Sequence, residues 1–280
     1  MSGADGPLVG RHVVRAGGST VHVRAVAASC EKAQQPPLVL VHQSPLSSRR
    51  FEPLLAELAS WTSALAPDTP GYGDSPRLAV ETSVEDLAAT LWGAVDELAP
   101  GAVRLLGRAT GAVLAAQMAA SRPQRVQHLV LHGVPLYTPQ EAASRLRDFA
   151  PPYVPDDEGS HLGWIWRRLR AEYPWAPPAL VTSFVADYLA AGPDFATAYR
   201  AMWRFDLDTA LRRIEEGGIR TTLIAGGRDR IGFMHERARA RITWADEHVL
   251  SEATDFVAEQ DPAGFARLLS EVFATRGASR

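Results

Sequence analysis

Residues Leu105–Ala115 read LLGRATGAVLA and join three structural signals within a short stretch. Val103–Leu106 is predicted to be a buried strand, and the alanine-rich run Thr110–Ala120 is predicted to be a helix. The five residues between them, Gly107-Arg108-Ala109-Thr110-Gly111, leave room only for a tight turn with Ala109 at its apex. The stretch therefore predicts a strand that passes through a sharp bend directly into a helix.

Further strands can be predicted on both sides of this bend. Leu38–Val41, Leu129–Leu131 and Thr222–Ala225 are short apolar runs, which are typical of parallel strands buried on both faces. Val13–Val26 alternates around Gly17-Gly18, which predicts an antiparallel hairpin. Because helical segments alternate with these strands, the pattern indicates an α/β domain with a mostly parallel sheet.

Two helix starts are also predicted from capping residues. Thr82 and Glu85 have the spacing of a capping box, so we expect a helix to begin there and to end before Pro100-Gly101. Ser160 stands before a second helical segment and is expected to be its N-cap.

Between Pro135 and Gly217 the alternation stops and only helical signals remain. This stretch holds four of the seven tryptophans and five of the six tyrosines. We therefore expect three segments: a first core part at 1–135, a helical lid at 136–216 and a second core part at 217–280. A lid after a central strand would cover the carboxyl edge of the sheet, where α/β sheets bind ligands. The alternative is that the aromatic residues only pack the lid onto the core.

Composition excludes several classes of protein. Lys+Arg 29 against Asp+Glu 32 gives a net charge of −3, so no basic field favours nucleic acid or anionic membranes. The single cysteine, Cys30, excludes an intrachain disulfide. There is no long apolar run and no apolar leader-like segment at the start, so we expect a cytoplasmic protein with no membrane partner. No cluster has metal-ligand spacing and no phosphate-binding loop is present, so no metal and no cofactor are expected; the oligomeric state stays open.

Three segments together resemble the α/β-hydrolase superfamily, in its lid-bearing branch. Leu38–Ser48 (LVLVHQSPLSS) is similar to the strand and loop that supply one oxyanion-hole amide, and Ala66–Ser75 (APDTPGYGDS) is similar to the family's Asp-x-Pro-Gly-x-Gly-x-Ser loop. The bend at Gly107–Gly111 is similar to the nucleophile elbow. The resemblance implies an α/β-hydrolase fold: a mostly parallel eight-stranded sheet flanked by helices, with a helical lid insertion.

The sequence departs from the family at the residues that carry its chemistry. Ala109 occupies the nucleophile position, and its methyl group cannot attack a carbonyl or an epoxide. Asp229, in IAGGRDRI, matches the family's acid, whereas Asp255 stands where the histidine is expected. Triad chemistry needs a nucleophile and an imidazole base, so the usual covalent hydrolase mechanism is not expected.

Several groups of a ligand site remain under the resemblance. The backbone amides of Ser44 and Thr110 would form the oxyanion hole, and the Thr110 side chain is expected to point back into its helix. Expected substrate contacts are Gln43, Arg108, Ala109, His161 and Trp164. Gln43 would either project into the pocket or plug its loop, and His161 would either reach the ligand or be a surface or packing residue of the lid.

Asp229 and Asp255 are the candidate catalytic residues. Two close carboxylates under an aromatic lid cannot both ionise at low cost, so one pKa should rise toward neutrality and that carboxyl could take and return a proton. Two alternatives stay open. Arg108 or Arg228 would neutralise the pair, or Asp255 would turn to solvent.

Three functions follow. The first is a non-hydrolytic enzyme (epimerase, isomerase, cyclase or lyase type) acting on a small organic molecule or a peptide-derived substrate. In lacking a working triad, the sequence is similar to atypical members of bacterial natural-product pathways, including an epimerase of bottromycin biosynthesis. The second is a catalytically inactive hydrolase that binds a ligand, and the third is a hydrolase with displaced catalytic residues.

Overall fold

The structure, a computed structural model, describes residues 8–29, 35–78, 81–149 and 151–274, so Cys30 lies outside the described residues. Its centre is an eight-stranded sheet in the order β1-β2-β4-β3-β5-β6-β7-β8. The hairpin β1–β2 is antiparallel, β2 pairs antiparallel with β4, and all other pairs are parallel. The strands are Gly10–Ala16, Ser19–Val26, Leu38–Val41, Ala64–Pro67, Val103–Arg108, Val126–His132, Arg220–Gly226 and Asp246–Leu250. The predicted sheet and hairpin are confirmed.

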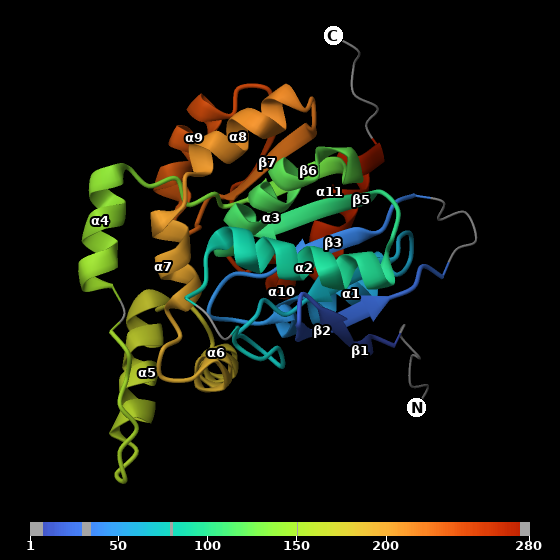
Figure 1. The fold of residues 1–280 in the computed structure, drawn as a ribbon. Coiled ribbons are helices and arrows are strands. Elements are labelled where there is room, and N and C mark those ends of the chain that lie inside the picture. Colours follow the sequence, from blue (N-terminus) through green and yellow to red (C-terminus); the bar gives the residue numbers. More distant parts are fainter. Residues whose placement is uncertain (1–7, 30–34, 79–80, 150, 275–280) are drawn as a thin grey trace.

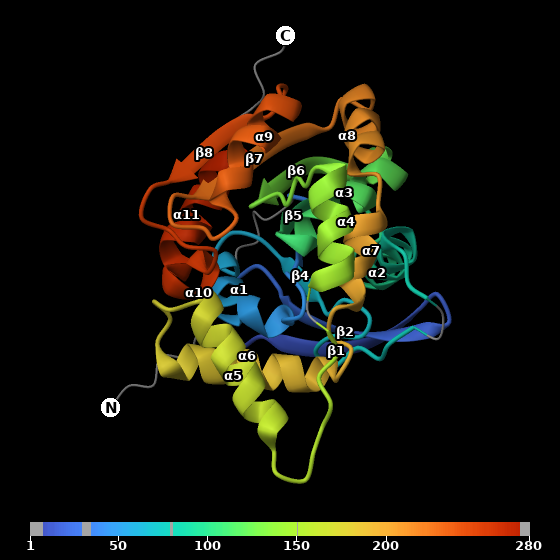
Figure 2. The same ribbon diagram turned by 90° about the vertical axis from the view of Figure 1, so that its left-hand side faces the viewer.

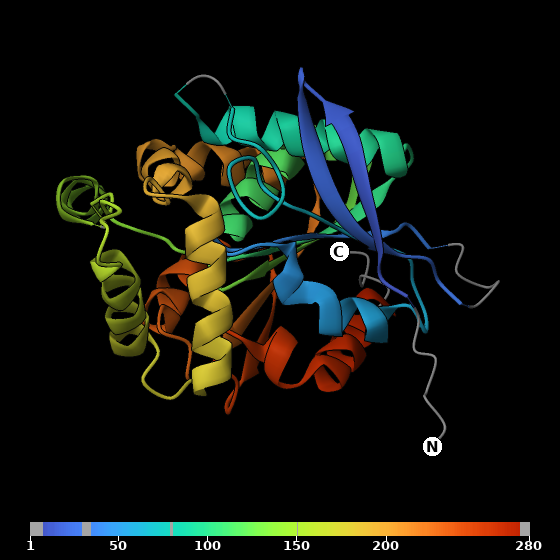
Figure 3. The ribbon, with the colours of Figure 1, turned by 90° about the horizontal axis from the view of Figure 1, so that it is seen from below.

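Helices cover both faces of the sheet (Figures 1 and 3). Successive residues of β3 alternate between the two faces, as strand geometry requires. Leu38 and Leu40 pack with α1 (Glu52–Leu58) and α11 (Pro262–Ala274). Val39 and Val41 belong to the larger core on the other face, which includes α2 (Val84–Leu98), α3 (Thr110–Ser121) and α8 (Leu207–Glu216).

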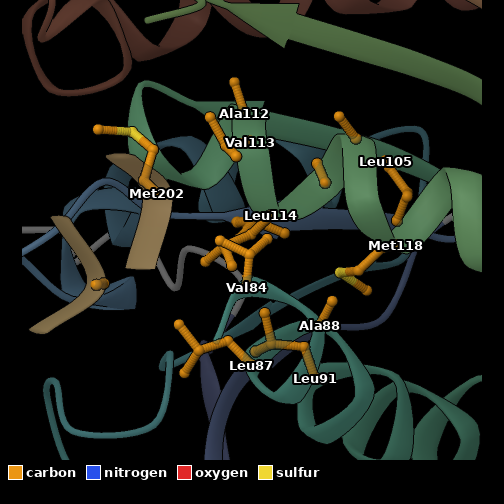
Figure 4. Packing of buried hydrophobic residues seen from close by; sticks show 14 of the residues in the cluster. Val84, Leu87, Ala88, Leu91, Leu105, Ala112, Val113, Leu114, Met118 and Met202 are labelled. Atoms are coloured by element: carbon orange, nitrogen blue, oxygen red, sulfur yellow. The ribbon is translucent and has the colours of Figure 1, made fainter. Parts of the chain in front are cut away.

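The packing of α2 against α3 is shown in Figure 4, where Leu87 and Leu91 point toward Leu114 and Met118. The helix α2 begins one residue later than predicted. Ser83, not Thr82, is the N-cap: its hydroxyl accepts from Asp86 N, and the Asp86 carboxylate accepts from Ser83 N. Ser83 and Asp86 have the same spacing as the predicted pair, so the sequence pattern alone did not separate the two registers.

The insertion between β6 and β7 is helical, as predicted (Figures 1 and 2). It contains α4 (Pro139–Asp148), α5 (Ser160–Glu172), α6 (Pro178–Ala191), α7 (Thr197–Arg204) and α8, of which α8 packs against α3 beside the sheet. The expected N-cap of α5 was wrong by one residue, because Gly159 in the left-handed conformation takes that position and Ser160 is the first helical residue. None of the helices in the described residues is long and apolar enough to cross a bilayer.

A buried ion pair fixes the lid to the core. Arg50, in the 3-10 helix after β3, lies 3.2 Å from Asp187 of α6 (Nε to Oδ2). Ser47 donates a hydrogen bond to the same carboxylate (2.8 Å), and Arg50 donates one to the Ser183 hydroxyl (2.7 Å). These contacts hold α6 over the loop that follows β3.

The loop after β4 braces the loop that follows β3. The buried Asp68 carboxylate accepts from Ser48 N and Asp74 N, and its bond to His22 helps to hold its pKa below the ordinary range despite burial. His42 Nε2 accepts from Thr69 N at 2.9 Å, and burial lowers the pKa of the ring. His42 is thus a neutral structural brace.

Candidate active site

The chain bends at Ala109, between β5 and α3. Ala109 has φ 47° and ψ −117°, and it is the only non-glycine residue with positive φ among those that the structure describes. Its amide donates to the carbonyl of His132 on β6. The flanking glycines are required by close packing: a Cβ on Gly111 would lie 2.2 Å from the Val41 carbonyl oxygen, and one on Gly107 would lie 2.2 Å from the Gly111 carbonyl oxygen. The bend thus has a strained backbone, and a methyl group stands at its apex.

A small cavity of about 40 Å³ lies at this bend. It brings together six residues selected from the sequence, namely Gln43, Ser44, Ala109, Thr110, Asp229 and Asp255. It adds seven that the sequence did not indicate: Pro135, Tyr137, Tyr173, Tyr199, Met202, Arg230 and Ile231. Four of these, Tyr137, Tyr173, Tyr199 and Met202, come from the insertion, so the cavity lies between the core and the lid.

One of the two amides expected to form the oxyanion hole, that of Ser44, already has a partner. Ser44 N donates to Oγ1 of Thr110 at 2.6 Å. The expectation that the Thr110 side chain points back into its helix was therefore wrong. The loop after β3 passes close to the first turn of α3. An unpaired buried amide would cost more free energy than a threonine side chain that turns away from its own helix. In this structure Thr110 occupies the hydrogen-bonding position that a substrate oxyanion would need.

Asp255 is buried in the loop before α10 (Val257–Gln260) and does not turn to solvent. Its Oδ2 lies 3.9 Å from Nη2 of Arg108, and its Oδ1 has no hydrogen-bond partner in the structure. Burial raises the pKa of Asp255 to about 6; Arg108 opposes this rise and Asp229 adds to it. The carboxyl can therefore take and release a proton near neutral pH.

Asp229 is held in a different way. Its Oδ1 accepts from Ile231 N at 2.9 Å, and the carboxylate packs so closely on Gly133 that a Cβ there would lie 2.9 Å from Oδ2. Arg228 pairs with the exposed Glu252, and does not neutralise the two aspartates. Of the two cations considered from the sequence, only Arg108 lies near Asp255.

Arg108 does not line the cavity; it is buried behind Asp255. Its guanidinium lies over the ring of Phe256, 4.8 Å from the centroid, and Nη2 has no hydrogen-bond partner. Glu259 of α10 is a second carboxyl beside this cation, and both of its oxygens are buried without hydrogen-bond partners. Burial raises the pKa of Glu259 to about 7, with Arg108 and Arg50 opposing. Arg108 therefore acts on both carboxyls, together with Arg50 at Glu259 and Arg230 at Asp255. The sequence pattern did not single out Glu259.

Arg230 and the tyrosines close the lid side of the cavity. Arg230 lies 3.0 Å from Glu172 at the end of α5 (Nη1 to Oε1) and its guanidinium lies over the ring of Tyr173. The Tyr199 hydroxyl donates to the carbonyl of Ser44 at 2.5 Å. Burial raises the pKa of both tyrosines well above the ordinary value, so both are neutral phenols at physiological pH.

His161 and Trp164 are not among the residues that line the cavity. His161 stacks on Tyr153 at 5.7 Å between centroids, and Trp164 packs against Tyr153 and Phe195. Both belong to the first two turns of α5, whereas the opposite end of this helix leads into Tyr173 at the cavity. A helix of this length separates its ends by roughly 18 Å at 1.5 Å per residue. For His161, the structure favours the packing alternative, because its side chain is only 15% exposed and stacks on Tyr153.

One group of side chains in the described residues has the composition of a metal site: His22, Asp68 and Asp74, whose ligand atoms lie within 4.8 Å of one another. The guanidinium of Arg24 lies against the same carboxylates, with Nη1 3.4 Å from Asp68 and Nη2 3.7 Å from Asp74. The arrangement is therefore a charge network already holding one cation. None of these residues lines the cavity at Ala109.

Residues 36–262 match a family model described as the alpha/beta hydrolase fold, and the chain therefore belongs to this family. Among curated proteins, a 92-residue segment is 40% identical to the biotin biosynthesis bifunctional protein BioHC of Cellvibrio japonicus (33% of this chain, 17% of that protein). A 105-residue segment is 27% identical to (E)-2-((N-methylformamido)methylene)succinate hydrolase of Acinetobacter baylyi (37% of this chain, 40% of that protein). The matches thus span less than half of either relative.

Solved structures show the same fold at low sequence identity. The enol-lactonase of Burkholderia xenovorans LB400 superposes with a TM-score of 0.74 at 17% identity, covering 94% of this chain and 100% of that chain. A hydrolase from Pseudomonas aeruginosa PA01 gives 0.75 at 21% identity, with 95% and 98% covered. These solved structures therefore share the fold of this chain.

Proposed function

We propose that this chain is an enzyme that acts on a small organic molecule or peptide-derived substrate by proton transfer, with Asp255 as the base and no covalent enzyme intermediate. One observation carries the proposal: Asp255 lines the cavity, is buried, and keeps one carboxyl oxygen without a hydrogen-bond partner. A buried carboxyl that is neither fully paired nor solvated is an effective proton acceptor near neutral pH.

The remaining cavity groups support this role. Ala109 removes the nucleophile but leaves space for a reacting group at the bend. The neutral phenols of Tyr173 and Tyr199 and the guanidinium of Arg230 bound that space on the lid side. Asp229 is held by Ile231 N and contributes a second negative charge that favours proton uptake by Asp255.

Two reactions use such a base. In the first, Asp255 removes a proton from an acidic C–H of the substrate and returns it, as an epimerase, isomerase, cyclase or lyase requires. In the second, Asp255 takes a proton from a water molecule whose oxygen attacks the carbonyl carbon of an ester or amide; the C–O or C–N bond then breaks, and the proton passes from Asp255 to the leaving group. The relatives named as hydrolases favour the second reaction, and the absence of a histidine from the described cavity lining means that it would proceed without a triad.

The test compares the wild-type protein with Asp255→Asn, which keeps size and removes the base. Deuterium incorporation from D₂O into C–H acids such as N-acyl amino thioesters and thiazoline peptides is followed by NMR, and hydrolysis of a small-ester panel by chromatography. We expect the wild type to show either deuterium incorporation or ester hydrolysis. The rate of that reaction should fall by about 10²-fold or more in Asp255→Asn. Glu252→Gln, an exposed carboxyl change, is the matched control.

A fluorophosphonate probe separates this proposal from a hydrolase with a displaced nucleophile. We expect hydrolysis, if present, without covalent labelling. Labelling of the wild type, or equal activity in Asp255→Asn, would contradict the proposal. Thermal stabilisation by panel compounds without exchange or hydrolysis would instead support the ligand-binding alternative.

A further inference from the structure

The cavity at Ala109 is too small to hold a whole substrate. Its volume of about 40 Å³ has room for a few water molecules. Ligand pockets usually measure about 300–1,000 Å³. The rest of any organic substrate must therefore lie in adjoining space.

Such space lies next to the cavity, between α4, α7 and the start of α8. A crevice of about 440 Å³ is lined here by Val113 of α3, Leu136, Ala142 of α4, Trp203 of α7 and Leu207 of α8. Figure 2 shows α4 and α7 side by side over α3, and α4 and α7 are in contact. The volume lies within the range of small-molecule sites.

The crevice and the cavity share a wall. Pro135, Tyr137 and Met202 line both spaces. Met202 is unbranched and has three rotatable side-chain bonds, so a rotamer change can move its thioether without moving the backbone. Tyr137 is half-buried and packs edge-on against Trp203 at 6.2 Å between centroids. Movement of the Met202 side chain is thus a low-cost way to join the two spaces.

The walls of the crevice define the chemistry of its occupant. Its interior residues are apolar, and the charged residues at its rim already have partners. Asp206 caps α8 through Thr209, Asp208 pairs with Arg241, and Arg204 pairs with Glu81. Each charged residue among the described lining thus has a partner of its own, so burial of apolar surface is the main source of affinity for an occupant.

We propose that the crevice between α4 and α7 binds the uncharged, apolar part of the substrate, while the reactive end passes between Tyr137 and Met202 to Asp255. Only the role of the reactive end rests on the proposed function. Binding of an apolar molecule in the crevice can be measured without any turnover.

The test uses N-phenyl-1-naphthylamine, a neutral apolar fluorophore, titrated against the whole protein. Ala142→Trp fills the crevice, and Ala143→Trp is the matched control because Ala143 is exposed on the same helix and does not line the crevice. We expect saturable binding to the wild type and to Ala143→Trp, and binding at least tenfold weaker in Ala142→Trp. Circular dichroism confirms the fold of each variant, and Leu136→Arg provides a second change in the same wall.

Equal binding in all variants, or no saturable binding to the wild type, would overturn the inference. Asp255→Asn should bind the fluorophore as the wild type does, because Asp255 does not line the crevice. If the wild type binds the fluorophore as expected but shows neither exchange nor hydrolysis, the proposed chemistry fails and the crevice inference stands. If the wild type shows exchange or hydrolysis but does not bind the fluorophore, the crevice inference fails and the proposed chemistry stands.

Discussion

The Ser44 amide nitrogen lies 2.6 Å from Oγ1 of Thr110 and donates a hydrogen bond to it. A side chain thus accepts from an amide that we expected to face a substrate oxyanion. Ala109, which has no nucleophilic atom, lines the same cavity. Both observations are consistent with the proposed chemistry, which forms no covalent enzyme intermediate.

Rebuilding the triad tests the effect of this hydrogen bond. The variant Ala109→Ser/Asp255→His restores a nucleophile and an imidazole, but Thr110 still holds the Ser44 amide. Adding Thr110→Ala should raise the hydrolysis of p-nitrophenyl acetate by about 10²-fold, since one oxyanion donor is worth about 10²–10³ in rate. The double variant is the control. Equal rates with and without Thr110→Ala would show that the amide is available to the substrate.

The buried carboxyls should make stability depend on pH. Burial raises the pKa of Glu259 to about 7 and that of Asp255 to about 6, above ordinary values of about 4. The folded protein then holds protons that the unfolded chain releases, so each carboxyl lowers the free energy of unfolding as pH rises between the two values.

Glu259→Gln should therefore be more stable than the wild type at neutral pH, by roughly 3 kcal/mol at about 1.4 kcal/mol per pKa unit. The difference in free energy of unfolding between Glu259→Gln and the wild type should still increase between pH 6 and 7. The corresponding difference for Asp255→Asn should level off near pH 6. Urea unfolding from pH 4 to 8 measures both curves. A constant difference across this range would mean that Glu259 is not a buried titrating group.

The ion pair between Arg50 and Asp187 should contribute to the attachment of the lid. Asp187→Ala leaves a buried guanidinium without its carboxylate and should cost about 3 kcal/mol in urea unfolding. Glu252→Ala removes the partner of exposed Arg228 and should cost less than about 1 kcal/mol. Similar losses for the two variants would indicate that the pair under α6 is solvated.

The elbow should not tolerate a side chain at Gly111. Gly111→Ala places a Cβ 2.2 Å from the Val41 carbonyl oxygen, a backbone atom that cannot move cheaply, and should destabilise the protein by about 3 kcal/mol or more. Gly101→Ala meets nothing within 4 Å and should change the melting temperature little. Comparable melting temperatures would mean that β3 and α3 are not packed as closely as described.

Local sequence signals predicted much of the fold. The run Leu38–Val41 is the strand β3, and the bend at Gly107–Gly111 forms where a strand must enter a helix within five residues. Apolar runs and glycine spacing are local properties that reflect burial and backbone conformation directly. The two capping positions were each missed by one residue, because neighbouring residues offered similar capping chemistry.

The candidate site was predicted only in part. Ala109, Asp229 and Asp255 follow predicted strands or stand at positions that the resemblance to the family implied, so their convergence at one cavity could be expected. Tyr199 and Arg230 reach the cavity from a lid helix and a loop, and no local pattern distinguishes them from packing residues. The rotamer of Thr110 and the burial of Glu259 depend on which segments pack against them, which the sequence does not state.

The proposed chemistry requires Asp255 to be a buried base that titrates near neutrality. A pH titration of the Asp255 carboxyl carbon by NMR, in protein labelled at aspartate, measures this property, with the signal assigned through its loss in Asp255→Asn. We expect a midpoint near pH 6. A midpoint below about 4, the value of an ordinary or fully paired aspartate, would contradict it.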